Sequence, residues 1–97
     1  MNFTDDDIKR IKDASANHLV DVVQDFQNLR KSGTSYVCDC PVCKASKKFS
    51  INPAKDIYSC FSCHQIAGAG ALDYLMRVEK KEFPDALEYL AHKFSIL

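Results

Sequence analysis

The sequence predicts an α+β fold in which a small antiparallel sheet of hairpins is packed with N-terminal and C-terminal helices. Three observations predict this fold. Apolar residues recur at helical spacing in the first and last thirds of the 97-residue chain, whereas apolar and polar residues alternate in the middle third. The middle third also carries two Cys-x-x-Cys pairs. We expect one domain over residues 1–97, helical over 4–27, a ribbon over 28–66, and helical again over 69–95.

The N-terminal region predicts two short helices. Thr4 is a suitable N-cap, and three acidic residues, Asp5 to Asp7, follow it in the first turn, where they face the positive end of the helix dipole. A second helix is expected from about Asn17. The apolar residues of both helices are interpreted as core positions: Ile8, Ile11, Ala14, Leu19, Val22, Val23 and Phe26.

Two hairpins are expected in the middle of the chain. The segment Ser32-Gly33-Thr34-Ser35 is a turn signal between residues 29–31 and 36–38. The turn Asn52-Pro53-Ala54-Lys55 separates two alternating strands, 48–51 and 56–60. Alternation points Phe49 and Ile51 into the core together with Ile57, and leaves Lys48, Tyr58 and Phe61 as the candidates for contact with a ligand.

The C-terminal region again reads as helical. A helix is expected from Ala71, after Gly68-Ala69-Gly70, and a last helix begins near Phe83, with Pro84 in its first turn. The apolar stripe of the last helix is either core or a docking face, and core is the favoured interpretation. Its members are Phe83, Ala86, Leu87, Leu90, Ala91 and Phe94.

The cysteine spacing predicts a structural metal site. Sixteen residues separate Cys40-x-x-Cys43 from Cys60-x-x-Cys63. Tetrahedral Zn²⁺ takes four thiolates at about 2.3 Å, and a two-residue gap lets both sulfurs of a pair reach one ion. The alternatives are four buried core cysteines, a disulfide framework and a redox-active dithiol. An acidic N-terminus unlike a secretory signal, and no apolar run of transmembrane length, predict a cytoplasmic protein without membrane contact, in which such spacing favours metal over disulfides.

Two further residues compete as ligands. Cys38 could replace Cys40, because Cys38-x₄-Cys43 is within the range of zinc spacings, but Cys40 matches the geometry of the second pair better. We therefore interpret Cys38 as a small buried hydrophobe. His64 follows Cys63 directly, and adjacent ligands rarely reach one metal, so a surface or supporting role is expected for it.

Charge is zero overall but unevenly distributed. Residues 1–29 carry six acids and three bases, residues 30–55 carry six bases and one acid, and residues 56–97 carry six acids and four bases. The basic block surrounds the first cysteine pair. It either compensates a four-thiolate zinc site, whose formal charge is −2, or binds nucleic acid.

The chain by itself is expected to be non-catalytic. A catalytic zinc keeps a coordination position open, and four thiolates leave none. The sequence has no Gly-rich phosphate loop and no acidic cluster suited to two-metal chemistry. An iron electron carrier uses the same four-cysteine chemistry and stays an alternative, although the lysines and the helical flanks fit it poorly.

Basic residues interleaved with aromatic residues favour a single-stranded nucleic acid as the partner. On one face of a sheet, basic side chains can neutralise phosphates and aromatic side chains can stack on nucleotide bases. The candidate phosphate contacts are Arg30, Lys31, Lys47 and Lys48, and the candidate stacking residues are Tyr58 and Phe61.

Taken together, these motifs resemble a known family. The order of knuckle, hairpin, knuckle and helices is similar to that of the N-terminal zinc-binding domain, a Cys-His-Cys-Cys type zinc finger, of DnaG-type bacterial and phage DNA primases. The resemblance covers nearly the whole chain. It is carried by Cys40-Pro41-Val42-Cys43, Lys48 to Pro53, Ile57 to Cys63, Gly68 to Leu75, and Phe83 to Ala91, and upstream by Leu19 to Val23 and Leu29 to Gly33.

The resemblance implies a zinc ribbon packed with helices, binding of a single-stranded DNA template, and a part in selecting the primer start site. It implies two partners: a separate Toprim-type catalytic domain, in cis or in trans, and the replicative helicase, reached through a longer protein. Cys43 stands where the family has histidine, and the segment Ser46 to Ser50 is one residue shorter, which favours a phage or mobile-element relative. A zinc ribbon for protein–protein interaction remains the alternative.

Overall fold

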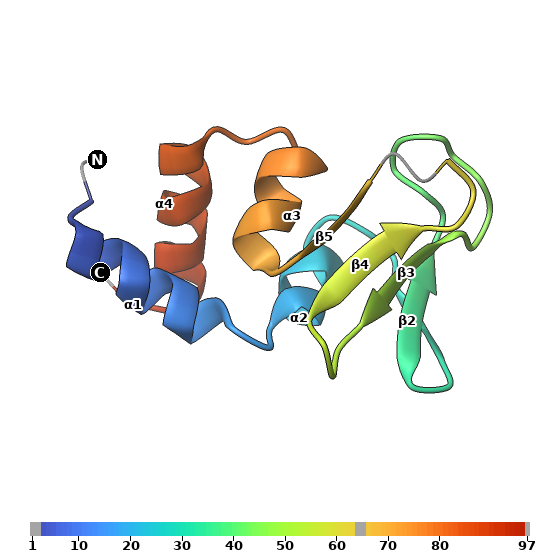
Figure 1. The fold of residues 1–97 in the computed structure, drawn as a ribbon, viewed down its shortest axis with the longest axis horizontal. Helices are drawn as coiled ribbons and strands as arrows, with labels where there is room; N and C mark the ends of the chain where they lie inside the picture. The colour runs from blue at the N-terminus through green and yellow to red at the C-terminus, as the bar shows by residue number, and fades with distance from the viewer. Residues whose placement is uncertain (1–2, 64–65, 97) are drawn as a thin grey trace.

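Four helices and a five-stranded sheet make up the structure, a computed structural model that describes residues 3–63 and 66–96. In Figure 1 the helices occupy one end of an elongated molecule and the sheet the other. The helices are α1 (Asp5–Ser15), α2 (Leu19–Gln24), α3 (Ala71–Arg77) and α4 (Phe83–Lys93). The expected α+β architecture is thereby confirmed.

The sheet is antiparallel throughout, in the order β1-β2-β3-β4-β5. Its strands are β1 (Arg30–Ser32), β2 (Ser35–Cys38), β3 (Phe49–Asn52), β4 (Ile57–Cys60) and β5 (Ala67–Ala69). The first four strands are the two hairpins expected from the sequence. The turn in the first hairpin includes Gly33, whose φ of +62° is in the region that favours glycine.

The fifth strand was not expected. Residues 67–69 pair with β4, with Ser59 opposite Ala67 and Tyr58 opposite Gly68. The segment Ala-Gly-Ala has no alternating large side chains, and its pattern therefore does not predict a strand. Residue 69, expected in the last helical region, therefore belongs to the sheet, and helix begins at Ala71.

One face of the sheet packs on the helices. Phe49, Ile51, Tyr58 and Cys60 are at most 2% exposed, and Tyr58 meets the ring of Tyr74 edge-on at 5.7 Å. The expectation of an inward Ile57 and an outward Tyr58 was wrong, because alternation along β4 places Tyr58 on the same face as Cys60. Ile57 is 41% exposed instead.

The first helix begins where its sequence signals place it. The Thr4 side chain accepts a hydrogen bond from the Asp7 backbone, and the Asp7 carboxylate accepts one from the Thr4 backbone, both at 3.1 Å. This reciprocal pair is a capping box. The chain then turns at Asn17, whose φ is +64°, and the second helix begins at Leu19 rather than Asn17.

A single turn residue, Asp56, fixes the sheet to two helices. Its carboxylate accepts a hydrogen bond from the backbone of Leu19 at 3.1 Å, at the start of α2. Its carbonyl accepts one from Gly70 at 2.8 Å, immediately before α3. Asp56 adopts a φ of +58°, a left-handed conformation that Asp tolerates better than most residues. The β3–β4 turn is therefore held against the helical half.

Asp73 of α3 makes the other link between sheet and helices. Tyr58 donates its hydroxyl to one carboxylate oxygen at 2.8 Å, and Arg77 donates Nε to the other at 2.6 Å. A Cβ atom placed on Gly68 would lie 1.8 Å from the first oxygen and 2.8 Å from the Tyr58 hydroxyl. The β5 backbone approaches this pair too closely for any side chain.

We predict that Gly68→Ala lowers the free energy of unfolding by about 1–3 kcal/mol, the usual cost when a buried hydrogen bond is lost and one of its polar groups is left without a partner. The added methyl group must displace the Asp73 carboxylate from Tyr58. Urea denaturation followed by circular dichroism measures the change. Ala67→Ser, on an exposed position of the same strand, is the control; equal stabilities for the two variants would contradict the prediction.

Candidate metal centre and nucleic-acid interface

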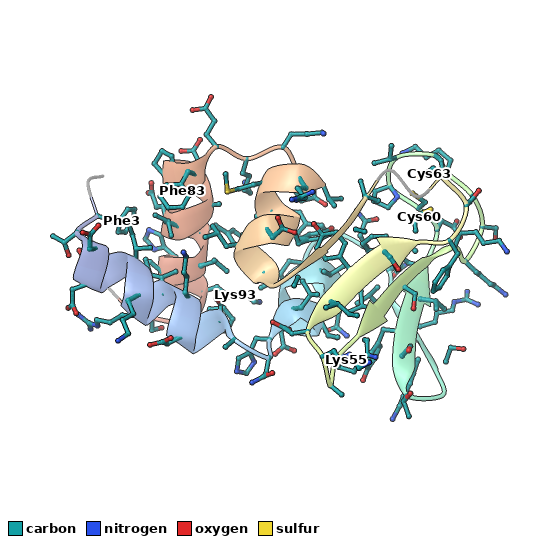
Figure 2. The ribbon with its side chains drawn as sticks, viewed as in Figure 1. Phe3, Lys55, Cys60, Cys63, Phe83 and Lys93 are labelled. Atoms are coloured by element: carbon teal, nitrogen blue, oxygen red, sulfur yellow. The ribbon has the colours of Figure 1, made fainter. Side chains whose placement is uncertain are left out.

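Four cysteine sulfurs converge at the end of the sheet away from the Asp56 turn. The sulfurs of Cys40, Cys43, Cys60 and Cys63 all lie within 4.8 Å of one another. Figure 2 labels Cys60 and Cys63 at this end and Lys55 at the opposite end of the β3–β4 hairpin. Zn–S bonds of about 2.3 Å place the sulfurs of a regular tetrahedron about 3.8 Å apart. The Cys43 and Cys60 sulfurs are 3.7 Å apart, so the cluster fits a tetrahedral metal site.

The two knuckles have matching local structure. The backbone N–H groups of Val42 and Cys43 point at the Cys40 sulfur, and those of Ser62 and Cys63 point at the Cys60 sulfur, all at 3.4 Å. At Cys60 these donors favour the negatively charged form of the sulfur. The same turn is thus built twice, once after β2 and once after β4.

Backbone hydrogen bonds lower the pKa of two of the thiols, Cys60 and Cys43. Burial opposes ionisation of Cys60, but the N–H groups of Cys63 and Ser62 lower its pKa to about 6. A backbone hydrogen bond from Ala45 lowers the pKa of Cys43, the exposed member of the cluster. Both sulfurs are therefore inclined to the thiolate form, which is the form that binds metal.

Cys38 behaves differently from the four clustered cysteines. It ends β2 opposite Phe49, is 7% exposed, and lies outside the cluster. Burial, then the negative charges of Asp39 and Cys40, raise its pKa to about 11. Cys38 thus stays a neutral thiol, in keeping with the expected core role. His64, the other competing ligand, lies outside the described residues.

The face of the sheet turned away from the helices carries small side chains. One register row crosses all five strands, with each residue opposite the next: Arg30, Val37, Ser50, Ser59 and Ala67. The row has only one long side chain, Arg30, at its β1 end. We call this surface the open face.

Beyond this row, toward the cysteines, the ladder continues with Lys48 and Phe61. The Phe61 N–H donates to the Lys48 carbonyl at 2.8 Å. Alternation from Phe49 and Cys60 turns both side chains toward the open face. Phe61 is 60% exposed. A lysine and a phenylalanine are therefore paired through their backbones next to the metal site, and both are exposed.

The expected contact residues are only partly brought together. Arg30, Lys48 and Phe61 share the open face, and Lys47 lines the same cavity as Arg30. Lys31 is opposite Tyr36 and so turns to the other face of the sheet. Tyr58 is 2% exposed and bonded to Asp73, so the stacking role expected for it was wrong.

Comparison with known proteins agrees with this geometry. The family model described as the CHC2 zinc finger, the zinc ribbon of DnaG, matches residues 3–97. The chain belongs to this DnaG-type primase zinc-finger family. The family implies that the metal at the four-cysteine cluster is zinc. Cys43 supplies sulfur where the resemblance expects histidine, and its position within the cluster shows that the replacement preserves a four-ligand site.

Its relatives are much longer proteins. The chain is 42% identical over 80 residues to a DNA primase of Helicobacter pylori, covering 81% of this chain and 14% of that protein. It is 37% identical over 92 residues to a DNA primase of Pseudomonas putida, covering 94% and 13%. The chain thus spans about one seventh of the curated relatives it matches.

A solved structure shares the fold. It is the crystal structure of the Aquifex aeolicus primase, containing zinc-binding and RNA polymerase domains. The similarity has a TM-score of 0.76 at 28% sequence identity and covers 92% of this chain and 21% of that one. The chain is therefore a zinc-binding domain related to DNA primase.

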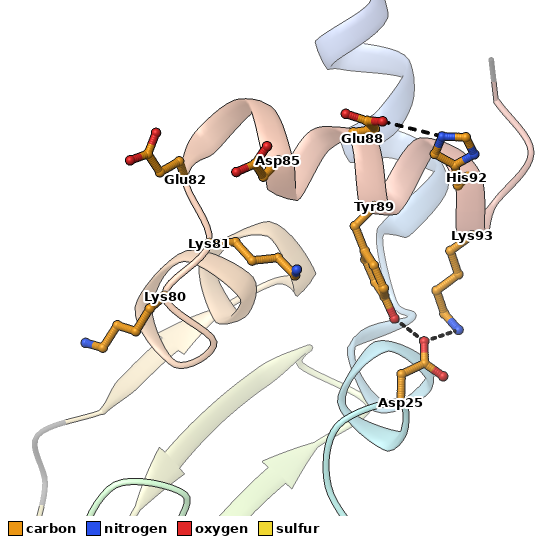
Figure 3. Close-up of a pocket in the computed structure, with 9 residues that line it drawn as sticks. All are labelled: Asp25, Lys80, Lys81, Glu82, Asp85, Glu88, Tyr89, His92 and Lys93. Carbon is orange, nitrogen blue, oxygen red and sulfur yellow. Dashed lines mark hydrogen bonds and ion pairs between the residues drawn. The ribbon is translucent and has the colours of Figure 1, made fainter. Parts of the chain in front are cut away.

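A second hollow lies on the helical half of the primase-type domain. It has a volume of about 900 Å³ and is lined by α4, the α3–α4 loop and Asp25. Figure 3 shows Tyr89 and Lys93 pointing at Asp25; Lys93 lies 2.8 Å from that carboxylate. These bonds, Lys93 first, lower the pKa of Asp25. The lining has four acidic residues beside three lysines and a histidine, so the hollow offers no basic surface for nucleic acid. The hydrogen bonds of Asp25 with Tyr89 and Lys93 join the end of α2 to α4.

Sequence reasoning missed several polar residues beside the metal centre. Gln27, Asn28 and Ser46 line a cavity together with Arg30 and Lys47. They lie in connecting segments, where neither helical nor strand periodicity marks a side chain. No helix in the described part of the chain has both the length and the apolar character that crossing a membrane requires.

We predict that the purified chain binds one zinc ion and that chelation unfolds at least residues 36–63. Structural zinc contributes on the order of 10–16 kcal/mol to small domains, which exceeds the stability of a typical domain. Elemental analysis measures the stoichiometry, and circular dichroism with and without chelator measures the unfolding. Bound iron, or a melting curve unchanged by chelator, would disprove it.

We also predict that Cys38→Ser retains full zinc content whereas Cys40→Ser loses it. Of these two cysteines, Cys40 is the one whose sulfur lies in the cluster and accepts hydrogen bonds from two backbone N–H groups. Metal content per chain, measured after gel filtration, distinguishes the two variants. The reverse pattern would mean that the knuckle uses the other cysteine.

Proposed function

We propose that this chain is the zinc-binding domain of a DNA primase, with one Zn²⁺ held by Cys40, Cys43, Cys60 and Cys63. We further propose that it binds single-stranded DNA template on the open face and helps select the primer start site. The observation that carries the proposal is the pair Lys48 and Phe61, exposed on the open face beside the cysteine cluster.

The surface suits a flexible single strand better than a duplex. Stacking on an exposed ring and neutralisation of phosphates by nearby cations are the usual means of binding single strands. Small side chains in the row from Val37 to Ala67 leave room for the sugar–phosphate backbone to lie close to the sheet. Affinity is expected to be weak, because the net charge is zero and a four-thiolate zinc site is itself negative.

Primer synthesis is assigned to a partner. The four-sulfur shell leaves zinc no open position, and the cysteine cluster is the one group of three or more metal-ligating side chains among the described residues. A catalytic domain, in cis or in trans, would carry out polymerisation, and linkage to it would raise the effective template concentration. The replicative helicase is proposed as a partner of the longer protein. The cytoplasmic location and the mobile-element origin stay predictions.

Protein docking is the second candidate function. Val42, which is 40% exposed, and Phe61 occupy the middle positions of the two knuckles and so present apolar side chains at the tip of the sheet. A partner protein would bury both residues and would not need the lysines. Salt dependence separates the two functions.

We predict that Lys48→Ala reduces the salt dependence of single-strand binding by about 0.7 in the slope of log affinity against log salt. Phe61→Ala should weaken binding by about 1–3 kcal/mol through the lost stack. Fluorescence anisotropy of a labelled oligonucleotide at several salt concentrations measures both effects.

Two matched controls accompany these variants. Lys55→Ala removes an exposed lysine at the far end of the same hairpin and should bind as wild type does (Figure 2). Tyr58→Phe should lose about 1 kcal/mol of stability with the Asp73 hydrogen bond and still bind DNA. If Lys48→Ala binds with unchanged affinity and slope, the basic block only balances the zinc site, and the docking function is favoured.

A further inference from the structure

A cavity of about 430 Å³ opens at the edge of the sheet beside the first knuckle. Pairing of β1 with β2 ends at Arg30 opposite Val37, so Cys38 and Asp39 continue without a partner from β1. The segment that leads from α2 into β1, including Gln27 and Asn28, lines one part of the cavity, and Ser46 and Lys47 line another. Its volume is within the range of small-molecule sites.

The lining changes from apolar to polar toward the surface. Cys38 is buried, Val37 and Gln27 are half-buried, and the other lining residues are exposed and polar or charged. A nucleotide base has a similar division, with flat apolar faces and a hydrogen-bonding edge.

Three side chains at the cavity have unused hydrogen-bonding capacity. Within residues 3–63 and 66–96, the Asn28 amide, the Arg30 guanidinium and the Lys47 ammonium make no hydrogen bond or ion pair in the structure. By contrast, the Asp39 carboxylate accepts the Lys47 backbone N–H at 3.1 Å and so fixes the loop that carries this lysine. An amide offers a donor and an acceptor together, which matches the edge of a base.

The cavity adjoins the proposed single-strand path. Lys47 lines the cavity, and the next residue, Lys48, lies beside Phe61 on the open face. Arg30 belongs to both, because it lines the cavity and ends the open-face row. Consecutive Cα atoms are about 3.8 Å apart, so the cavity and the open face meet at Lys47 and Lys48.

We propose that this cavity takes one unstacked base of single-stranded DNA, with Asn28 bonding to the base edge and Arg30 and Lys47 binding the flanking phosphates. This proposal rests on the single-strand binding proposed above, and it assigns the preference for one base over another to the cavity. Asn28 is then the residue that determines specificity, whereas Lys48 and Phe61 bind any sequence.

The first test compares binding to oligo(dA), oligo(dC) and oligo(dT) of equal length. Wild type should prefer one homopolymer by at least about fivefold, the effect of one or two hydrogen bonds. Asn28→Ala should reduce this preference below about twofold and leave affinity for the weakest homopolymer unchanged. Gln24→Ala, which removes an exposed amide on α2 away from the cavity, should keep the preference. Zinc content and circular dichroism confirm that each variant is folded.

The second test uses the four deoxynucleoside monophosphates and two-dimensional ¹H–¹⁵N NMR of the zinc-loaded chain. The preferred nucleotide should shift the Asn28 side-chain and Arg30 signals, and the Gln24 side-chain signals should stay in place. If Phe61→Ala loses single-strand binding but Asn28→Ala keeps the base preference, the cavity proposal is overturned and the proposed function stands. If wild type binds no single strand at any salt concentration, both are overturned.

Discussion

Convergence of four sulfurs from two separate loops is the constraint on which the ribbon depends. The strands are three or four residues long, too short to hold their connecting loops in place by backbone pairing alone. The N–H groups of each knuckle turn toward one sulfur, and the two knuckles meet with Cys43 and Cys60 3.7 Å apart. This contact between the knuckles also sets the positions of Lys48, Phe61 and Ser46, because each of them lies within a few residues of a clustered cysteine.

The helical half has a different source of order. Its apolar residues form a continuous core with the inner face of the sheet, and aromatic rings lie across the junction. Tyr74 is central to this junction, since it meets Phe26, Phe49 and Tyr58 at centroid distances of 5.7 to 6.3 Å. The helices thus supply burial that a zinc ribbon of this size lacks, and the metal supplies the tertiary link that the loops lack.

The sequence predicted features that depend on neighbouring residues and missed those that depend on distant ones. The two cysteine pairs, the Thr4 cap and the two hairpins are local patterns, and the structure has each of them. The orientation of β4 is different, since alternation alone allows either Ile57 or Tyr58 to face inward. Asp73, fifteen residues away, accepts the Tyr58 hydroxyl and gives it a partner inside. The cavity beside the first knuckle was also missed, because its walls come from two separate connecting segments, α2–β1 and β2–β3, together with β1 and β2.

The turn at Asp56 has a mechanical consequence. It joins the sheet to the starts of α2 and α3 at one end of the β3–β4 hairpin, whereas Cys60 and Cys63 of the cysteine cluster lie at the other end (Figure 2). Phe49 and Cys60, at the cysteine end, are also buried, and the Phe49 ring lies 6.2 Å from the Tyr74 ring of α3. The hairpin is therefore held against the helices at both of its ends, so the position of the cysteine cluster relative to α3 is set along the whole hairpin.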